Sequence, residues 1–225
     1  MQKEVYDYKN LKLTNITRPE YRHLLLIFSW FGYFLAYFLT ERFIPAENCY
    51  SVHCFLDDIV PFCELFIIPY VGWYFLIAWS LIYFLRYNVE NFKALQKYII
   101  ITQVVATIIF IVAPSRQDLR PEVLPRDNIL TALVGLIYSA DTNTGVCPSL
   151  HVAYSLGIVS AWLKERTASV RVKIFVTIAV ILICLSVAFV KQHSVVDIFA
   201  ALPLGLFAEV IVFRKYYKEK NKKGS

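Results

Sequence analysis

Six apolar segments set the main limit on how this chain can fold. A helix of about 20 apolar residues is long enough to cross the hydrocarbon core of a bilayer. Apolar residues make up 58% of the 225-residue chain, whereas a soluble domain has closer to half. We therefore predict an all-α integral membrane protein with six transmembrane helices, at residues 23–44, 63–85, 98–113, 148–163, 172–190 and 194–213.

The charged residues lie mainly outside these segments and divide the chain into three parts. Residues 1–22 form a polar lead-in, residues 23–213 the membrane domain, and residues 214–225 a basic tail. Because the lead-in is polar and the first apolar segment is too long for a signal peptide, we expect no cleaved leader.

The connection at residues 115–147 is the longest, and it contains an apolar stretch at 129–140. This stretch is too short to cross a bilayer. Asp127 or Asn128 could cap it as a helix. We expect a short interfacial or re-entrant helix there.

Lysine and arginine are unevenly distributed between the two sides of this layout. Six crossings put both termini on one side, which then holds 18 of the 23 cations and leaves 5 for the other. Positive charge marks the cytoplasmic side. We therefore expect both termini in the cytoplasm and the opposite side facing the periplasm, the outside or a lumen. The net charge of +6 then reflects topology and anionic lipid rather than a nucleic-acid partner. Short loops and compact size favour a bacterial cell membrane.

Two short stretches each place a histidine at the edge of an apolar segment. Residues 147–151 read Cys-Pro-Ser-Leu-His and end at His151, and residues 191–197 read Lys-Gln-His-Ser-Val-Val-Asp. In the second stretch His193 and Asp197 are four residues apart, which is one turn along the same face of a helix. Ionisable groups at membrane depth are costly and usually functional. We interpret the two stretches as halves of one catalytic site.

These residue types suit phosphoryl transfer. A neutral His193 can attack phosphorus as a nucleophile. The carboxylate of Asp197 can accept the Nδ1 proton, which leaves Nε2 unprotonated and stabilises the charge formed on attack. A protonated His151 can donate to the leaving oxygen as a general acid.

Phosphate ligands are available on the same side of the membrane. Arg120, with Arg116 or Arg126, could hold the phosphoryl oxygens, since guanidinium binds phosphate in a bidentate manner. Arg116 and Arg126 could equally contact lipid headgroups. Ser149 and the backbone N–H groups from Leu150 onward suit an anion at a helix N-terminus.

Other polar residues have simpler interpretations. We expect His23 and His53 to lie at the headgroups, and Glu64 and Glu209 to be solvated carboxylates near segment ends. The sequence leaves open which outward cysteines form disulfides: Cys49, Cys54, Cys63 and Cys147.

The motif residues resemble the type 2 phosphatidate phosphatase superfamily of membrane lipid phosphatases. That family has three signatures in this order: Arg-Pro, Pro-Ser-Gly-His, and Ser-Arg followed by His and Asp. Here Arg120-Pro121 matches the first, and residues 148–151 match the second with leucine in place of glycine. Ser186, His193 and Asp197 have the spacing of the third. The resemblance covers roughly residues 98–210.

Two cations of the family signatures are missing from this chain. Ala113 stands where a lysine is expected, and Val187 stands in place of the arginine. Lys191 could replace that arginine, and Arg116 or Arg126 could replace the lysine. A basic residue just before the histidine is also similar to the sphingomyelin and inositol-phosphorylceramide synthase branch.

The resemblance implies metal-independent chemistry without a cofactor, through a phosphohistidine. By carry-over, His193 is the nucleophile, Asp197 orients it, His151 is the general acid, and Arg120 and Ser149 bind phosphate. The first hypothesis is a lipid phosphatase acting on phosphatidate, phosphatidylglycerol phosphate or undecaprenyl diphosphate. The alternative is a phosphotransferase that moves a phospho-headgroup onto a lipid alcohol. A third hypothesis is a non-enzymatic lipid-binding or transport protein. The oligomeric state is left open.

Overall fold

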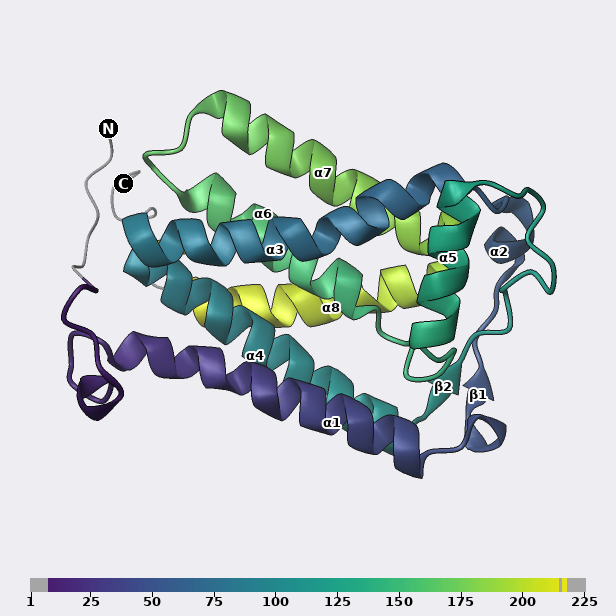
Figure 1. Ribbon diagram of the computed structural model, residues 1–225, viewed down its shortest axis with the longest axis horizontal. Coiled ribbons are helices and arrows are strands. Elements are labelled where there is room, and N and C mark those ends of the chain that lie inside the picture. Colours follow the sequence, from purple (N-terminus) through teal and green to yellow (C-terminus); the bar gives the residue numbers. More distant parts are fainter. Residues whose placement is uncertain (1–7, 215, 218–225) are drawn as a thin grey trace.

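The computed structural model describes residues 8–214, 216 and 217 of the chain. Its main body is a bundle of helices lying side by side, with a cap of short elements at one end (Figure 1). The bundle helices are α1 (Ser29–Phe43), α3 (Ile67–Tyr87), α4 (Val89–Val112), α6 (Leu150–Lys164), α7 (Val170–Phe189) and α8 (Val195–Val212). The chain is therefore mostly α-helical, as the sequence predicts.

Five segments in the described part of the chain are long and apolar enough to cross a membrane: Arg22–Thr40, Glu64–Tyr87, Val89–Val112, Val170–Phe189 and Val195–Val212. This is the pattern of a multi-pass membrane protein. The remaining predicted crossing, at 148–163, forms α6. Its 15 residues fall short of the roughly 17 to 25 that a crossing needs. The predicted count of six crossings is therefore not confirmed.

Helix α6 lies inside the bundle, where it packs against α4, α7 and α8. Small residues allow this close packing, since Ala153 and Ala161 are fully buried. A Cβ atom on Gly157 would overlap the ring of Tyr98 on α4. Because its neighbours cover it, α6 is a core helix rather than a lipid-facing one.

Helix α4 begins at Val89, so the predicted start at residue 98 is wrong. The sequence-based boundary followed the uninterrupted apolar run, which charged residues break. The structure shows that Val89, Phe92 and Leu95 are buried at the spacing of one helix face. The Asn88 side chain caps this start by accepting a first-turn N–H at 3.1 Å.

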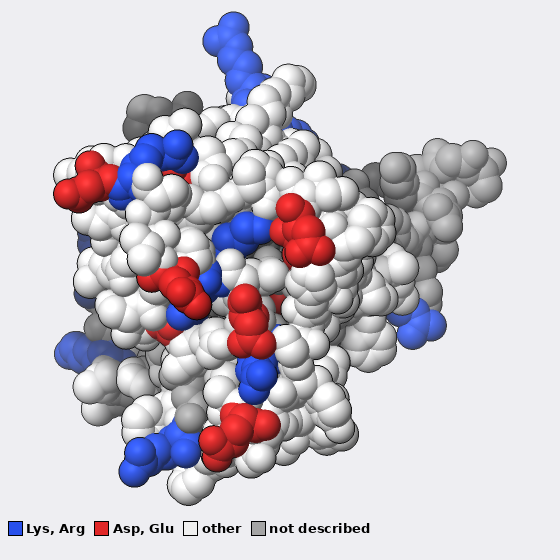
Figure 2. Space-filling model, turned by 90° about the vertical axis from the view of Figure 1, so that its right-hand side faces the viewer, with Lys and Arg blue, Asp and Glu red and all other residues white. Residues whose placement is uncertain are grey.

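The cap contains α2 (Phe55–Ile59), α5 (Ile129–Ala140) and two short parallel strands, β1 (Tyr50–Ser51) and β2 (Ser115–Arg116). It also contains the 3-10 turns Ala46–Asn48 and Glu64–Phe66. Figure 2 looks onto this end of the molecule and shows cationic and anionic side chains interspersed rather than segregated. Cations and anions in the cap are therefore close enough to form ion pairs.

Helix α5 confirms the short helix predicted at 129–140. Asn128, rather than Asp127, caps it, because its side chain accepts the N–H groups of Leu130 and Thr131. The position of α5 relative to a membrane stays a prediction.

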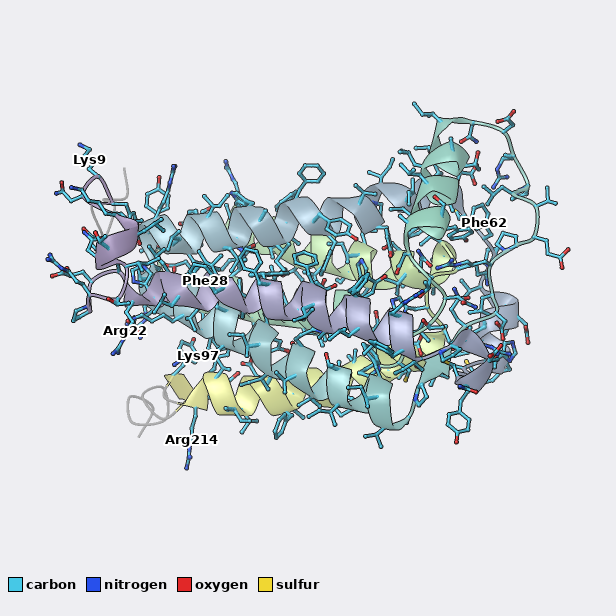
Figure 3. The ribbon with its side chains drawn as sticks, turned by 60° about the horizontal axis from the view of Figure 1, so that its bottom comes forward. Lys9, Arg22, Phe28, Phe62, Lys97 and Arg214 are labelled. Carbon is cyan, nitrogen blue, oxygen red and sulfur yellow. The ribbon has the colours of Figure 1, made fainter. Side chains whose placement is uncertain are left out.

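The end of the bundle opposite the cap carries basic residues from distant parts of the chain. Lys9, Arg22, Lys97 and Arg214 lie at this end, and Phe62 lies at the cap (Figure 3). The chain here includes the 3-10 turns Leu13–Asn15 and Arg22–Phe28. Parts of the predicted lead-in and tail, residues 1–7, 215 and 218–225, lie outside the described residues. Which end faces the cytoplasm stays a prediction.

The outer surface of the bundle is apolar. Large side chains on it are well exposed, including Phe31 at 71% on α1, Phe75 at 72% on α3 and Phe175 at 59% on α7. Soluble monomers rarely expose contiguous apolar patches of this kind. The exposed rings therefore agree with a surface that contacts lipid.

Candidate functional site

The fold brings the two histidine stretches together at the cap end of the bundle. His151 lies in the first turn of α6, and His193 lies just before α8. Their ring centroids are 6.0 Å apart. The Ser149 backbone N–H donates to the Asp197 carbonyl at 3.1 Å, so the starts of the two helices are joined directly.

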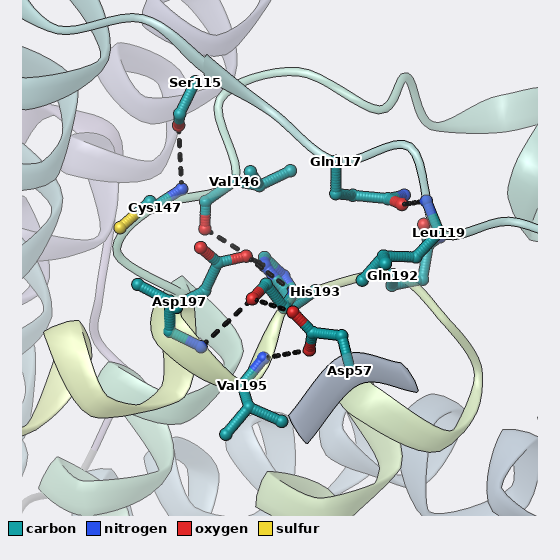
Figure 4. Close-up of polar contacts among 12 residues, drawn as sticks. Asp57, Ser115, Gln117, Leu119, Val146, Cys147, Gln192, His193, Val195 and Asp197 are labelled. Carbon is teal, nitrogen blue, oxygen red and sulfur yellow. Dashed lines mark hydrogen bonds and ion pairs between the residues drawn. The ribbon is translucent and has the colours of Figure 1, made fainter. Parts of the chain in front are cut away.

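The tautomer of neutral His193 follows from its contacts. Its Nδ1 lies 3.2 Å from Oδ2 of Asp197 and 3.0 Å from the Val146 carbonyl oxygen (Figure 4). Because both neighbours are acceptors, Nδ1 must carry the proton. The lone pair of neutral His193 is therefore on Nε2. The His193 side chain is 12% exposed and that of Asp197 is fully buried, so the pair is shielded from bulk water.

Asp197 also has a local structural role. Its Oδ2 accepts the Ser194 backbone N–H at 3.0 Å, and the Ser194 hydroxyl accepts the Val196 N–H at 3.1 Å. Together these bonds form a capping box at the start of α8. The carboxylate that faces His193 is therefore held rigidly by the helix it begins.

Cys147 lies beside this carboxylate and, like the other four cysteines, is a free thiol. Burial, together with the charge of Asp197, raises the pKa of Cys147 to about 12. A thiol with such a pKa stays protonated at neutral pH and is a poor nucleophile.

Aromatic rings enclose His151. Its ring centroid lies 4.5 Å from that of Tyr70 and 4.3 Å from that of Trp73, both on α3. The Tyr74 ring approaches at a steeper angle, with centroids 6.2 Å apart. No sequence motif links these rings to the site, because aromatic residues in a membrane segment are usually part of the core.

Four buried polar atoms in the two stretches have no hydrogen-bond partner within the described part of the chain. They are Ser149 Oγ, His151 Nε2, Gln192 Nε2 and Asp197 Oδ1. Buried polar atoms are nearly always bonded, and exceptions call for an explanation such as a ligand or an ion. A polar group that both accepts and donates hydrogen bonds would satisfy this set.

Arg120 lies next to the His193 loop, as expected, but its donors are already engaged. Nε and Nη2 donate to Oε1 of Gln192 at 3.2 and 2.6 Å. Nη1 donates to the carbonyls of Tyr138 and Asp141, and Nη2 to that of Thr142. All of these acceptors are uncharged, so the bonds leave the positive charge uncancelled. Binding a phosphate would require Arg120 to exchange at least one of them.

Arg116 and Arg126 are both paired with carboxylates. Arg116 Nε donates to Asp118 at 3.1 Å. Arg126 binds Glu64 in a bidentate manner, at 2.5 and 2.7 Å. Glu64 is only 6% exposed, so its interpretation as a solvated carboxylate is wrong. Neither arginine is placed at the histidines by these contacts.

Lys191 points to α2 and not to the histidines. Its Nζ donates to the carbonyls of Asp57 and Val60 at 2.8 and 2.6 Å. Burial lowers the pKa of Lys191, against the opposing effect of Asp57 and Asp58. These contacts do not support the predicted role of Lys191 as a phosphate ligand.

Leu150 occupies the position of the family glycine and is the first residue of α6. Its partly buried side chain packs against the core. Ser149, immediately before it, is the N-cap residue, although its hydroxyl makes no capping bond. Helix α6 thus begins two residues later than the predicted position at Pro148.

Asp57 is a neighbour of the site that no sequence motif indicates. Its carboxylate accepts the Ser194 hydroxyl at 2.6 Å and the Val195 N–H at 2.8 Å (Figure 4). Burial alone would raise the pKa of Asp57, but these bonds and those from Cys54 hold the pKa below its usual value. No local pattern could have linked α2 to residues so distant in the chain.

Two other polar residues differ from their predicted surroundings. Glu209 accepts from Lys164 Nζ at 2.6 Å and is not a solvated carboxylate. His23 is 5% exposed and lies 2.8 Å from the Tyr8 hydroxyl, so it is packed inside the protein. Neither contact lies in the two histidine stretches.

Two apolar cavities open along the bundle. One, of about 310 Å³, lies between α1 and α4 and includes Gly32 and Tyr154 in its lining. The other, of about 480 Å³, lies between α3 and α7 and includes Gly72. The Tyr154 ring is 5.9 Å from that of Trp73, which in turn contacts His151. The first cavity is thus linked to the histidines through two rings.

No family model, curated protein or solved structure matches this chain. The family resemblance therefore depends on the motif residues alone.

Proposed function

We propose that this protein is a membrane lipid phosphate phosphatase that acts through a phosphohistidine on His193. The observation that carries the proposal is the convergence of three groups from the two motif stretches. His193 Nδ1 lies 3.2 Å from Asp197 Oδ2, and the His151 ring centroid is 6.0 Å from that of His193. This arrangement matches a nucleophile, its orienting carboxylate and a second proton-transfer group.

In the first step, Nε2 of His193 attacks phosphorus and the bond from phosphorus to the lipid oxygen breaks. The leaving oxygen takes a proton from His151, and the charge that forms on His193 is stabilised by Asp197. In the second step, His151 accepts a proton from water as the water oxygen attacks phosphorus, and the bond from phosphorus to Nε2 of His193 breaks. Inorganic phosphate leaves and both histidines return to their starting states.

The surroundings of His151 favour protonation only when an anion is bound. Its ring contacts those of Tyr70 and Trp73, and charging a buried ring without a counter-ion is costly. A substrate phosphate would supply that counter-ion. The enzyme would then gain its general acid together with its substrate.

The phosphate would lie against the buried donors that have no partner. Ser149 Oγ and Gln192 Nε2 are such donors in the described chain. The positive charge of Arg120, held beside Gln192 at 2.6 Å, would attract the anion. One shift of the Gln192 amide would release two guanidinium donors for phosphate.

The apolar surface and the charge pattern support the lipid substrate and the sidedness that we propose. An apolar outer surface would let a lipid approach sideways, and the cavity of about 310 Å³ beside Tyr154 would hold part of its chain. With the termini in the cytoplasm, the site would face the outside or periplasm. In this topology α6 counts as a sixth, interior crossing and α5 lies at the interface. Phosphatidate, phosphatidylglycerol phosphate and undecaprenyl diphosphate are candidate substrates.

A second function, phosphotransfer to a lipid alcohol, is favoured by the burial of the site. The His193 side chain is only 12% exposed, and aromatic rings enclose His151. Restricted access of water would favour an alcohol as the acceptor in the second step. The same residues would carry out both reactions.

The deciding experiment identifies the molecule to which the phosphoryl group is transferred. Purified protein in EDTA would receive a panel of phospholipids with and without diacylglycerol or ceramide, with ³¹P NMR and lipid mass spectrometry as readouts. Phosphate that grows without an acceptor means hydrolysis. A new phospholipid that forms only with an acceptor means transfer. If neither product forms, or if EDTA abolishes activity and Mg²⁺ restores it, the proposed mechanism is wrong.

Two histidine variants, one as the test and one as its control, complete that experiment. His193→Ala should abolish turnover. His53→Ala should not, because His53 lies in the cap as an exposed partner of Asp58, at 2.9 Å. Retained turnover in His193→Ala would remove His193 as the nucleophile.

A further inference from the structure

The small helix α2 contacts the His193 loop, although more than 130 residues separate them in the chain. Its Asp57 is 4% exposed. One carboxylate oxygen accepts the Ser194 hydroxyl at 2.6 Å, and the other accepts the Val195 N–H at 2.8 Å. Hydrogen bonds to a charged acceptor are among the strongest in proteins. Asp57 therefore holds the two residues that directly follow His193.

Lys191 connects the other side of the loop to the same helix. Its Nζ donates to the Asp57 carbonyl at 2.8 Å and to the Val60 carbonyl at 2.6 Å. The Lys191 backbone has φ of 54°, in the left-handed region. A lysine keeps this conformation only when its surroundings hold it there. His193 is thus bracketed by residues that are bonded to α2.

The position of the His193 ring depends on this bracket. The His193 backbone N–H donates to the Val187 carbonyl at 3.0 Å, which ties the loop to the end of α7. The Nδ1 contact with Asp197, at 3.2 Å, is long enough that a small backbone shift would break it. The contacts of α2 with residues 191, 194 and 195 therefore hold the backbone on both sides of this His193–Asp197 contact.

We propose that Asp57 is a positioning residue for His193, acting through Ser194 and Val195, with Lys191 completing the clamp. The role rests on the proposed reaction at His193. It assigns a function in phosphoryl transfer to a part of the chain outside the three family signatures. A carboxylate that only stabilised the fold would change the amount of folded protein and not the turnover of each folded molecule.

The test compares Asp57→Asn with Asp58→Asn. Asp58 is the next residue on α2, its side chain is 70% exposed, and the substitution changes the charge by the same amount. Asp57→Asn should lower kcat by roughly 10- to 100-fold with KM nearly unchanged, since small misplacements of reacting groups cost about this much. Asp58→Asn should keep wild-type kcat. Ser194→Ala is the second variant if Asp57→Asn does not fold.

Hydrogen exchange measured by mass spectrometry provides a readout that does not need activity. Asp57→Asn should speed amide exchange in the segment 191–195 and leave α3 and α4 as in wild type. Wild-type kcat, or wild-type exchange in this segment, would overturn the proposal. If wild-type protein turns over no phospholipid, the proposed function fails by itself, and the exchange rates still decide whether Asp57 holds the loop.

Discussion

Replacing Asp197 by asparagine separates charge from shape at the candidate nucleophile. Asparagine has nearly the same volume and can still accept the Ser194 N–H that Asp197 accepts at 3.0 Å. It cannot stabilise the positive charge that forms on His193 during attack. At the observed separation of 3.2 Å, Coulomb's law with an effective dielectric constant of about 20 gives about 5 kcal/mol.

That free energy sets the expected loss of activity. At about 1.4 kcal/mol for each tenfold change in rate, it corresponds to a fall in kcat of roughly 10³- to 10⁴-fold. A histidine base that loses its aspartate in a serine protease triad shows a loss of about this size. KM should change little, because the interaction strengthens only as charge develops.

The assay is phosphate release from detergent-solubilised phospholipid in EDTA, with thermal unfolding as a measure of folding. Asp127→Asn is the matched control, because Asp127 is exposed in the cap and the substitution removes the same charge. An Asp197→Asn protein that unfolds like wild type and keeps more than about a tenth of its kcat would refute the reasoning, because a charge at this distance must be worth more than one decade.

Three further predictions test other parts of the structure. Hydrogen bonds hold the pKa of Asp57 in the folded protein below the usual value. The ionised carboxylate therefore stabilises the fold fully above the ordinary aspartate pKa of about 4, and this stabilisation is lost as the pH falls through the lower pKa of the folded state. The difference in melting temperature between wild type and Asp57→Asn should therefore shrink as pH drops below about 4; a constant difference from pH 3 to 7 would contradict this. His151→Gln should slow substrates with poor leaving groups more than an activated aryl phosphate, and equal losses would argue against proton donation. Gly32→Leu should raise KM for long-chain lipids and leave KM for short-chain lipids unchanged, since a side chain at this position enters open space in the cavity beside Tyr154. If Gly72→Leu has this effect and Gly32→Leu does not, the lipid chain lies between α3 and α7 instead.

Local geometry explains why parts of the site were predictable. His193 precedes Ser194, the N-cap residue of α8, and so lies outside the helix, but its four-residue spacing from Asp197 still brings the two side chains within 3.2 Å. Ser194 and Asp197 also form the capping box that their spacing indicates. The apolar runs likewise predicted α7 and α8 to within a few residues, because a helix in lipid must satisfy its backbone within its own segment.

Other contacts of the candidate site could not be predicted, because most of them pair residues that are far apart in the sequence. The fold pairs Arg126 with Glu64 at 2.5 Å and Arg116 with Asp118 at 3.1 Å, and the sequence did not predict either pairing. Both arginines have the right chemistry for phosphate, and sequence alone cannot rank competing carboxylates. Lys191 is a similar case, since its acceptors are the carbonyls of Asp57 on α2 and of Val60 just after it, and any carbonyl in the chain could have served.

The sequence by itself determined that this chain is built from apolar helices, and that a histidine and an aspartate lie four residues apart where α8 begins. Those properties depend on composition and on spacing within a short stretch of chain. Only the tertiary structure decided that α6 lies inside the bundle, that His151 is enclosed by Tyr70 and Trp73, and that α2 supports the His193 loop. These features depend on which side chains meet across the bundle, and the energy of such contacts exists only after the helices have packed.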